Sequence, residues 1–411
     1  MKKSVVEKYA RLIARVGAGI EKGDAVTIHS SVEIYDFIEI LVNECYIAGA
    51  SNVDIEWSDD IITKLSYKYR TLDSFKDIPK WKTEKMRERV EKRPCRIHIL
   101  SEAPDSLSGL DREKFDAVRA YSHKKFKKYL DAVEGDEKWT IAAYPGKAWA
   151  KHVFPNDNVN TAREKLLSAI LKSVKVDDVN DPISAWQKHN ENFKSRCNAL
   201  TAHHFDYLEY KSGNGTDFCV WLIPETHFCG GGEYTKSGKY FNPNMPTEEI
   251  FISPKKGMAE GKVVSTMPLS YNGHIIDKFF FEFKDGKVVD FNAEVGYDVL
   301  KSIVESDKGS SMLGEIALVP QKNAISEQGI LFYETLFDEN ASCHIALGSG
   351  YIDTVDDYAN KTLEECHKLG INESRVHVDF MIGADDMNIT GYKDGVATPI
   401  FINGEFAGEF S

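Results

Sequence analysis

Apolar side chains in the first third of the chain recur with two different spacings. Between residues 4 and 20 they return every three or four positions, which predicts an amphipathic helix (Val5, Tyr9, Leu12, Ile13, Val16 and Ile20). A second helix is predicted from about residue 33 to a stop at Gly49. Short apolar runs predict strands at 25–29, 52–57, 95–100 and 139–144. Because helices alternate with strands here, we expect a parallel α/β sheet.

The second half of the chain has a different pattern. A helix is predicted over 161–174, with Thr161 as its N-cap and Glu164 three residues later. A further helical stretch surrounds Trp186. From about residue 199 strand patterns dominate, with strands predicted at 199–210 and 216–223, and a hairpin of 279–283 with 287–291 across Asp285-Gly286.

The length of the chain favours more than one domain. At 411 residues it exceeds the size at which a single core keeps growing. We therefore expect an α/β protein of two domains. The N-terminal α/β/α sheet domain is predicted over 1–185 and a C-terminal, β-rich α+β domain over 186–411.

Composition narrows the range of partners. The formal net charge of −13 argues against nucleic acid, because phosphate binding needs a basic surface. No apolar run is long enough to cross a bilayer, and the N-terminal segment continues as an amphipathic helix rather than as a secretory signal. Seven scattered cysteines without a CxxC motif are typical of reduced thiols. We expect a cytoplasmic protein without a nucleic-acid or membrane partner.

Side chains that bind metal ions occur in three short apolar runs near the end of the chain. Glu315 opens the run EIALV, His344 opens HIAL, and His377 and Asp379 lie two residues apart in HVDFM. Residues i and i+2 of a strand face the same side, so the last two share one face. A lone His-x-Asp is more often a hydrogen-bonded structural pair than a ligand pair. Three such strands within one segment favour a metal site.

A fifth candidate precedes another apolar run, where either Glu248 or Glu249 supplies a carboxylate. Three carboxylates with two imidazoles suit zinc, cobalt or manganese rather than calcium. Two divalent ions and one bridging hydroxide balance three carboxylates, whereas one ion would leave the cavity negative. The set therefore predicts a two-metal hydrolase site. Other polar residues nearby are interpreted as supporting, capping or loop residues rather than ligands (Asp338, Glu339, Asp385, Asp386 and Asn388).

Four segments resemble the motifs of a known family. NMPTEEIF, LGEIALVP, TLFDENASCHIALGSGY and HVDFMIGADDMNITG are similar, in the same order, to those of the aminopeptidase T/aminopeptidase S family of metallo-aminopeptidases. The resemblance extends over about residues 195–405. It implies a two-domain α/β fold, a homodimer, and peptides with a free N-terminus as substrates. It also implies an active-site role for Tyr351, a bridging role for Glu315, and metal ligation by Glu249, Glu315, His344, His377 and Asp379.

The expected reaction is the removal of N-terminal residues from peptides by water that two metal ions activate. Tyr351 would donate a hydrogen bond to the tetrahedral oxyanion, and Glu249 or Glu315 would carry a proton to the leaving amine. Two alternatives stay open. One is a two-metal hydrolase of another amide or dipeptide C–N bond, and the other is a metal-binding protein without catalysis.

Overall fold

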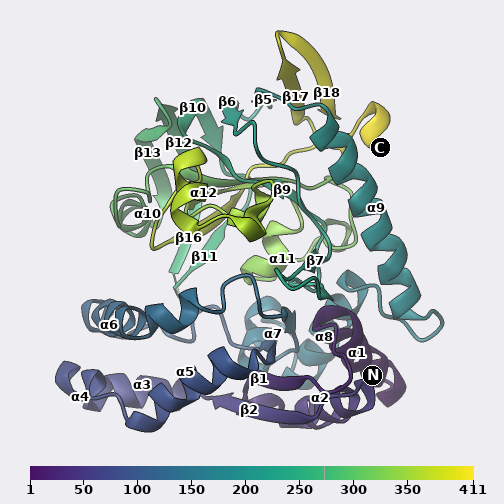
Figure 1. The fold of residues 1–411 in the computed structure, drawn as a ribbon, viewed down its shortest axis with the longest axis vertical. Coiled ribbons are helices and arrows are strands. Elements are labelled where there is room, and N and C mark those ends of the chain that lie inside the picture. The colour runs from purple at the N-terminus through teal and green to yellow at the C-terminus, as the bar shows by residue number, and fades with distance from the viewer. Residues whose placement is uncertain (273) are drawn as a thin grey trace. The chain divides into compact units, whose positions relative to one another are not determined.

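A computed structural model describes residues 1–272 and 274–411 (Figure 1). Contacts within the chain define two units, of which the first contains residues 1–186 and 232–245. The second unit contains residues 187–231 and 246–411. The backbone therefore passes from one unit to the other three times. The predicted domain limits of 1–185 and 186–411 stay a prediction.

The first unit is built on a parallel sheet, as the sequence predicted. Its strand order is β2-β1-β3-β4, and all three pairings are parallel. Buried and half-buried residues alternate along β1, with Val26 and Ile28 on the buried face. The strands are β1 (Ala25–Ser31), β2 (Asn52–Ser58), β3 (Cys95–Leu100) and β4 (Trp139–Ala143).

Helices connect these strands, and two of the predicted helix starts or ends need correction. The first helix continues as a π-helical turn, Ile13–Gly17, and stops before Ile20 because the backbone at Gly19 turns left-handed, with φ at +52°. The 161–174 helix begins earlier, at Val159, and its N-cap is Asn158 rather than Thr161, because the Asn158 side chain accepts from the Thr161 N–H. The helices are α1 (Lys3–Leu12), α2 (Tyr35–Ala48), α3 (Asp60–Tyr69), α4 (Leu72–Lys76), α5 (Lys80–Lys92), α6 (Arg112–Asp131), α7 (Lys147–Val153) and α8 (Val159–Ser173).

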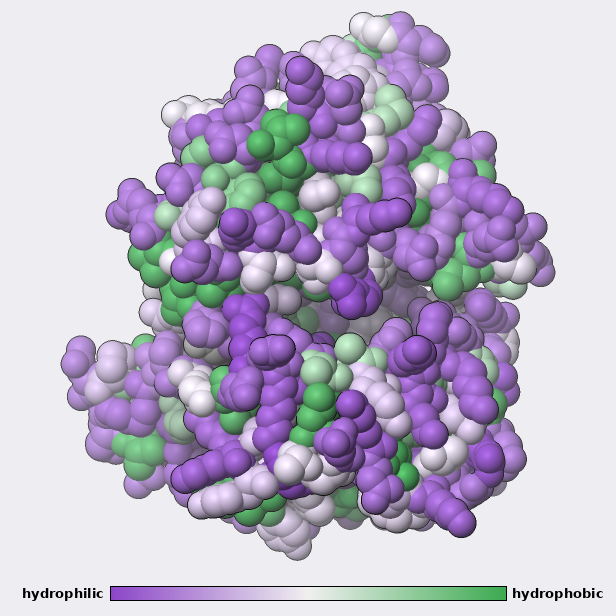
Figure 2. Space-filling view, turned by 90° about the vertical axis from the view of Figure 1, so that its left-hand side faces the viewer, coloured by the Kyte–Doolittle hydropathy of each residue, from purple (hydrophilic) through white to green (hydrophobic). Residues whose placement is uncertain are grey.

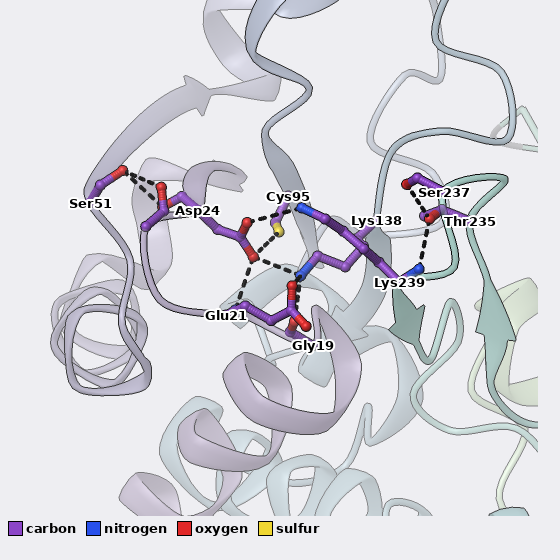
Figure 3. Close-up of polar contacts among 10 residues, drawn as sticks. Gly19, Glu21, Asp24, Ser51, Cys95, Lys138, Thr235, Ser237 and Lys239 are labelled. Atoms are coloured by element: carbon purple, nitrogen blue, oxygen red, sulfur yellow. Dashed lines mark hydrogen bonds and ion pairs between the residues drawn. The ribbon is translucent and has the colours of Figure 1, made fainter.

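The short excursion 232–245 joins the first unit through backbone and side-chain contacts. It forms the hairpin β7 (Glu233–Tyr234) and β8 (Tyr240–Phe241), and the Asn242 N–H donates to the Gly17 carbonyl at 2.9 Å. Figure 3 shows the charged contacts beside it. The buried Lys138 ammonium lies 2.6 Å from Asp24, whose second oxygen lies 3.4 Å from the Lys239 ammonium. Sequence patterns alone gave no sign of this attachment.

The second unit begins within α9 (Pro182–Ala202) and is rich in antiparallel strands. Residues 199–202 belong to α9, so the prediction of a strand over 199–210 was wrong at its start. The predicted hairpin is confirmed, because Asp285 and Gly286 both have positive φ, at +50° and +70°. A nine-stranded sheet has the order β11-β12-β10-β6-β5-β17-β18-β19, with β13 also paired to β12.

Most elements of the second unit pack around one large core cluster, and a smaller cluster contains Ile223, Val355, Cys366 and Ile371. A separate four-stranded sheet has the order β16-β15-β14-β9. The strands are β5 (Tyr207–Lys211), β6 (Asp217–Leu222), β9 (Ile250–Ile252), β10 (Pro254–Val264), β11 (Leu269–Tyr271), β12 (His274–Lys284), β13 (Lys287–Val295), β14 (Leu313–Leu318), β15 (His344–Gly348), β16 (His377–Met381), β17 (Asn388–Lys393), β18 (Val396–Ile402) and β19 (Glu405–Phe406). The helices are α10 (Tyr297–Val304), α11 (Thr335–Glu339) and α12 (Leu363–Leu369).

The face of the molecule that Figure 2 shows is mostly polar. Figure 2 shows one face on which hydrophilic side chains predominate and apolar side chains lie in small groups. Among the described residues, no helix combines the length and the hydropathy that a membrane span requires.

Candidate metal centre

A row of three residues crosses the four-stranded sheet and ends in a carboxylate on each side. Glu315 of β14 pairs with Ala346 of β15, and Ala346 pairs in turn with Asp379 of β16. Paired residues of adjacent strands point to the same face of a sheet. The methyl group of Ala346 therefore lies between two carboxylates, and its small size leaves room above the sheet.

The two predicted histidine ligands lie in the neighbouring rows of the same face. Ala317 pairs with His344 on one side of the carboxylate row, and Gly348 pairs with His377 on the other. On β14 and β15, the residues that pair with the two imidazoles therefore have a small side chain or none, whereas Met381 of β16 pairs with His344 on its other side. This arrangement brings four predicted ligands onto one face of a small sheet.

The opposite face of the same sheet is apolar. Ile316 pairs with Ile345, and Ile345 with Phe380, and all three are buried in the core of the second unit. These segments form strands because every second side chain of a strand can then be buried in this core. One β-strand pattern therefore produces both the core and the ligand face.

Another predicted ligand comes from outside this sheet face. Glu249 directly precedes β9, and its Oε2 lies 3.1 Å from the His344 Nε2. On the far side, the His377 Nε2 lies 3.1 Å from Glu315 Oε2 and 3.2 Å from Asp379 Oδ1. The structure therefore brings all five predicted ligands together.

Glu339, at the end of α11, also reaches the cluster, although the sequence interpretation set it aside as a supporting, capping or loop residue. One ligand atom each from Glu339, His344 and Asp379 lie within 4.8 Å of one another. In the sequence, Glu339 could have been noticed as a carboxylate five residues before His344. A sequence cannot show, however, that α11 turns back toward the strand that His344 begins. Two more groups meet the same distance limit, one of Glu249, Glu315 and His344 and the other of Glu315, His377 and Asp379.

Backbone carbonyls fix the proton on each imidazole. His344 Nδ1 lies 2.9 Å from the Glu339 carbonyl oxygen, and His377 Nδ1 lies 2.7 Å from the Ser349 carbonyl oxygen. A carbonyl only accepts hydrogen bonds, so each Nδ1 carries a proton. With its Nδ1 proton fixed in this way, a ring that loses its second proton has the lone pair of Nε2 on the side of the carboxylates, which is the orientation of a histidine metal ligand.

The charges of the cluster call for a cation. Burial opposes protonation of His344, but Glu249, Glu315 and Asp379 outweigh it and raise its pKa to about 9. Burial raises the pKa of Glu315 to about 7, against the attraction of His377. Asp379 Oδ1 is buried, and among the described residues it makes no hydrogen bond of normal geometry, although His377 Nε2 lies 3.2 Å away. Carboxylates and imidazoles in this number fit divalent ions of the zinc, cobalt or manganese type.

Tyr351 lies beside the cluster on the turn that follows β15. Its hydroxyl is 3.2 Å from the His377 Nε2, and its ring contacts the rings of Phe251 and His377. Although 41% of the residue is exposed, desolvation of its hydroxyl and the nearby carboxylates raise the pKa of Tyr351 above its usual value of 10. The phenol therefore keeps its proton at neutral pH and is a hydrogen-bond donor.

The carboxylate–imidazole cluster is a feature of metal-dependent hydrolases. The model of the thermophilic metalloprotease (M29) family matches residues 2–406, and the chain belongs to this family. This confirms the family that the sequence motifs resembled.

Named relatives match over the whole chain. Aminopeptidase AmpS of Bacillus subtilis (strain 168) is 39% identical over 97% of this chain and 97% of its own length. Aminopeptidase PepS of Streptococcus thermophilus is 39% identical over 98% of each chain. The solved structure of wild-type AmpT from Thermus thermophilus superimposes with a TM-score of 0.90 at 34% identity, and covers 99% of this chain and 100% of that one.

Proposed function

We propose that this protein is a metal-dependent aminopeptidase that removes N-terminal residues from peptides. The observation that carries the proposal is the convergence of carboxylates and imidazoles into three overlapping groups of ligand atoms. Membership of the metalloprotease family and relatives named aminopeptidases support the same reaction. Peptides with a free N-terminus are the proposed substrates, because the relatives are named aminopeptidases.

Two divalent ions are the proposed cofactors, with zinc, cobalt and manganese as candidates. Glu249 and His344 would hold one ion and His377 and Asp379 the other, with Glu315 shared between them. Glu339 is proposed as a sixth ligand because its carboxylate belongs to one of the three groups. When bound, such ions act as Lewis acids and lower the pKa of a water molecule.

The chain's own groups are proposed to complete the reaction. The Tyr351 phenol would donate a hydrogen bond to the scissile carbonyl oxygen as that oxygen gains negative charge. Glu249 or Glu315 would accept a proton from the attacking water and pass it to the leaving amine. These roles assign Tyr351, Glu249 and Glu315 to catalysis.

Three further properties are proposed with this function. We propose that the chain forms a homodimer and works in the cytoplasm, where its seven free cysteines would stay reduced. We also propose that 1–185 is a separate α/β domain and that 186–411 is the catalytic domain. Light scattering of the purified protein tests the dimer.

The function is tested with peptides that differ only at the N-terminus. The enzyme is stripped with a chelator, and activity is measured after adding zinc, cobalt or manganese. We expect cleavage of free peptides only with metal, and no cleavage of acetylated ones. Glu315→Gln should abolish it, whereas the control Glu409→Gln, at a side chain that is 62% exposed, should not. Equal cleavage of acetylated peptides would favour another amide hydrolase, and no metal-dependent cleavage would contradict both.

A further inference from the structure

Ser253 lies outside the metal cluster and contacts the backbone of Tyr351 twice. It follows β9 directly, and only 1% of its surface is exposed. Its Oγ accepts a hydrogen bond from the Tyr351 N–H at 2.8 Å and donates one to the Tyr351 carbonyl at 3.2 Å. A serine hydroxyl makes both bonds at once, because it has one donor hydrogen and acceptor lone pairs.

Neighbouring residues leave this contact little freedom. Thr354, also buried, donates its Oγ1 hydrogen to the same Tyr351 carbonyl at 2.7 Å. A Cβ at Gly350 would lie 3.1 Å from Ser253 Oγ, so a larger residue there would crowd the hydroxyl. Ser253 therefore holds the turn after β15 against the end of β9, and Thr354 supports the same Tyr351 carbonyl from within the turn.

The position of Ser253 links the phenol to one of the proposed metal ligands. Glu249 lies four residues earlier, and β9 between them is buried along its whole length. A buried strand that pairs with β14 has little room to shift. Ser253 therefore sets where the Tyr351 backbone stands relative to Glu249, and with it where the phenol points.

We propose that Ser253 is a positioning residue for catalysis, which acts by holding the Tyr351 backbone so that the phenol reaches the developing oxyanion. The inference rests on the proposed aminopeptidase function. Loss of the hydroxyl removes both bonds and frees the turn. Because a misplacement of about 1 Å costs on the order of 100-fold in rate, Ser253→Ala should lower kcat by about 10- to 100-fold.

A double-mutant cycle between Ser253→Ala and Tyr351→Phe tests this role. In the wild-type background, Ser253→Ala should lower kcat and change KM and metal content little. In the Tyr351→Phe background, the same change should lower kcat by no more than about two-fold, because non-additive effects mark residues that act as a unit. Ser253→Thr keeps the hydroxyl and should restore most of kcat. Hydrogen exchange at the Tyr351 amide should speed up in Ser253→Ala.

Ser173→Ala is the matched control, because Ser173 is also a buried serine whose hydroxyl donates to a backbone carbonyl. It should leave kcat unchanged. An active wild type whose Ser253→Ala variant has normal kcat, or an equal kcat loss in both backgrounds, would overturn the inference and leave the function standing. A wild type that cleaves no peptide with any metal would overturn both.

Discussion

Small residues between the ligands are as important to the centre as the ligands themselves. Ala346 stands between Glu315 and Asp379, and Ala317 and Gly348 stand beside the two imidazoles. A branched or long side chain at any of these positions would occupy the space in which ions are proposed to bind. Such positions attract no notice in a sequence, because alanine and glycine occur everywhere.

Ala346→Leu should therefore prevent metal binding at the centre without unfolding the sheet. We expect the variant to bind less metal than the wild type, measured by elemental analysis after equilibration with zinc. The control is the adjacent Ile345→Val, on the apolar face, which should keep its metal and lose about 0.5–1.5 kcal/mol of stability. Full metal content in folded Ala346→Leu would contradict this account of the site.

Tyr351→Phe should lower kcat by about 100-fold, since removal of one oxyanion donor costs on the order of 3 kcal/mol in the barrier. Metal content should not change, because the phenol keeps its proton and is not one of the proposed metal ligands. Steady-state kinetics and metal analysis check both statements. Tyr297→Phe, at a tyrosine with a similar exposure of 43%, is the control and should retain wild-type kcat. Unchanged turnover in Tyr351→Phe would remove this residue from the mechanism.

At the scale of elements, α11 and the segment before β9 are joined by one buried amide. Asn340 is fully buried, its Oδ1 accepts from the Glu248 N–H at 2.7 Å, and its Nδ2 donates to the Leu336 carbonyl at 2.9 Å. The first bond is one residue from Glu249, and Asn340 itself follows Glu339. Two proposed ligands on separate elements therefore share this support.

Asn340→Ala should lower both stability and metal affinity. It removes both hydrogen bonds of this buried amide, at a cost of about 1–3 kcal/mol. Denaturant unfolding measures the loss of stability, and zinc titration of the metal-free protein measures the loss of metal affinity. Asn360→Ala, at an exposed residue whose amide donates to the nearby Asp357 carboxylate, should change stability by no more than about 0.5 kcal/mol. Wild-type zinc affinity in Asn340→Ala would show that other contacts fix the ligands.

In the first unit, a charged pair joins β1 and β2 and predicts a pH dependence. The His29 hydrogen bond, at 2.9 Å, and Lys85 hold the pKa of Glu56 at about 2, below its usual 4.5, although burial opposes them. A lowered pKa in the folded state contributes stability above the unfolded pKa, and that contribution is lost as the pH falls toward the folded pKa.

Glu56→Gln should thus destabilise the metal-free protein at pH 6 and have a smaller effect on its stability at pH 3. We expect a difference of about 1 kcal/mol at pH 6, since the carboxylate is partly exposed and its charge is screened. Urea unfolding of both proteins across this range provides the measurement. A difference that stays constant down to pH 3 would mean that the charge of Glu56 contributes nothing.

At the scale of the whole molecule, the ligand atoms all lie in the second unit, whereas five of the six tryptophans lie in the first. Metal binding stabilises only the folded state that binds it, by about 2.7 kcal/mol when the free ion is at 100 times its Kd. The two units should therefore respond differently to a chelator.

We expect chelation to lower the unfolding temperature seen by circular dichroism more than that seen by tryptophan fluorescence. Trp221→Phe removes the one tryptophan of the second unit and should sharpen the difference. Adding zinc back should bring the two transitions together. Equal shifts with both probes would show that the units unfold as one.

The sequence predicted most elements because their signals are local. Apolar alternation located β1 to β4, Gly49 marked the end of α2, and Asp285-Gly286 specified a hairpin turn. It missed the N-cap at Asn158 and the true start of the strand near 207, since caps and boundaries depend on single hydrogen bonds. The attachment of 232–245 to the first unit depends on contacts with residues about 100 to 200 positions away.

The sequence by itself determined which residues are ligand candidates, because His377 and Asp379 share a face through the two-residue period of a strand. Only the tertiary structure decided that five separate segments meet and that Glu339 joins them. The physical reason is the distance along the chain over which each interaction acts. Strand period and turn chemistry act over a few residues, whereas the cluster depends on strand register and on the folding of α11 back onto β15.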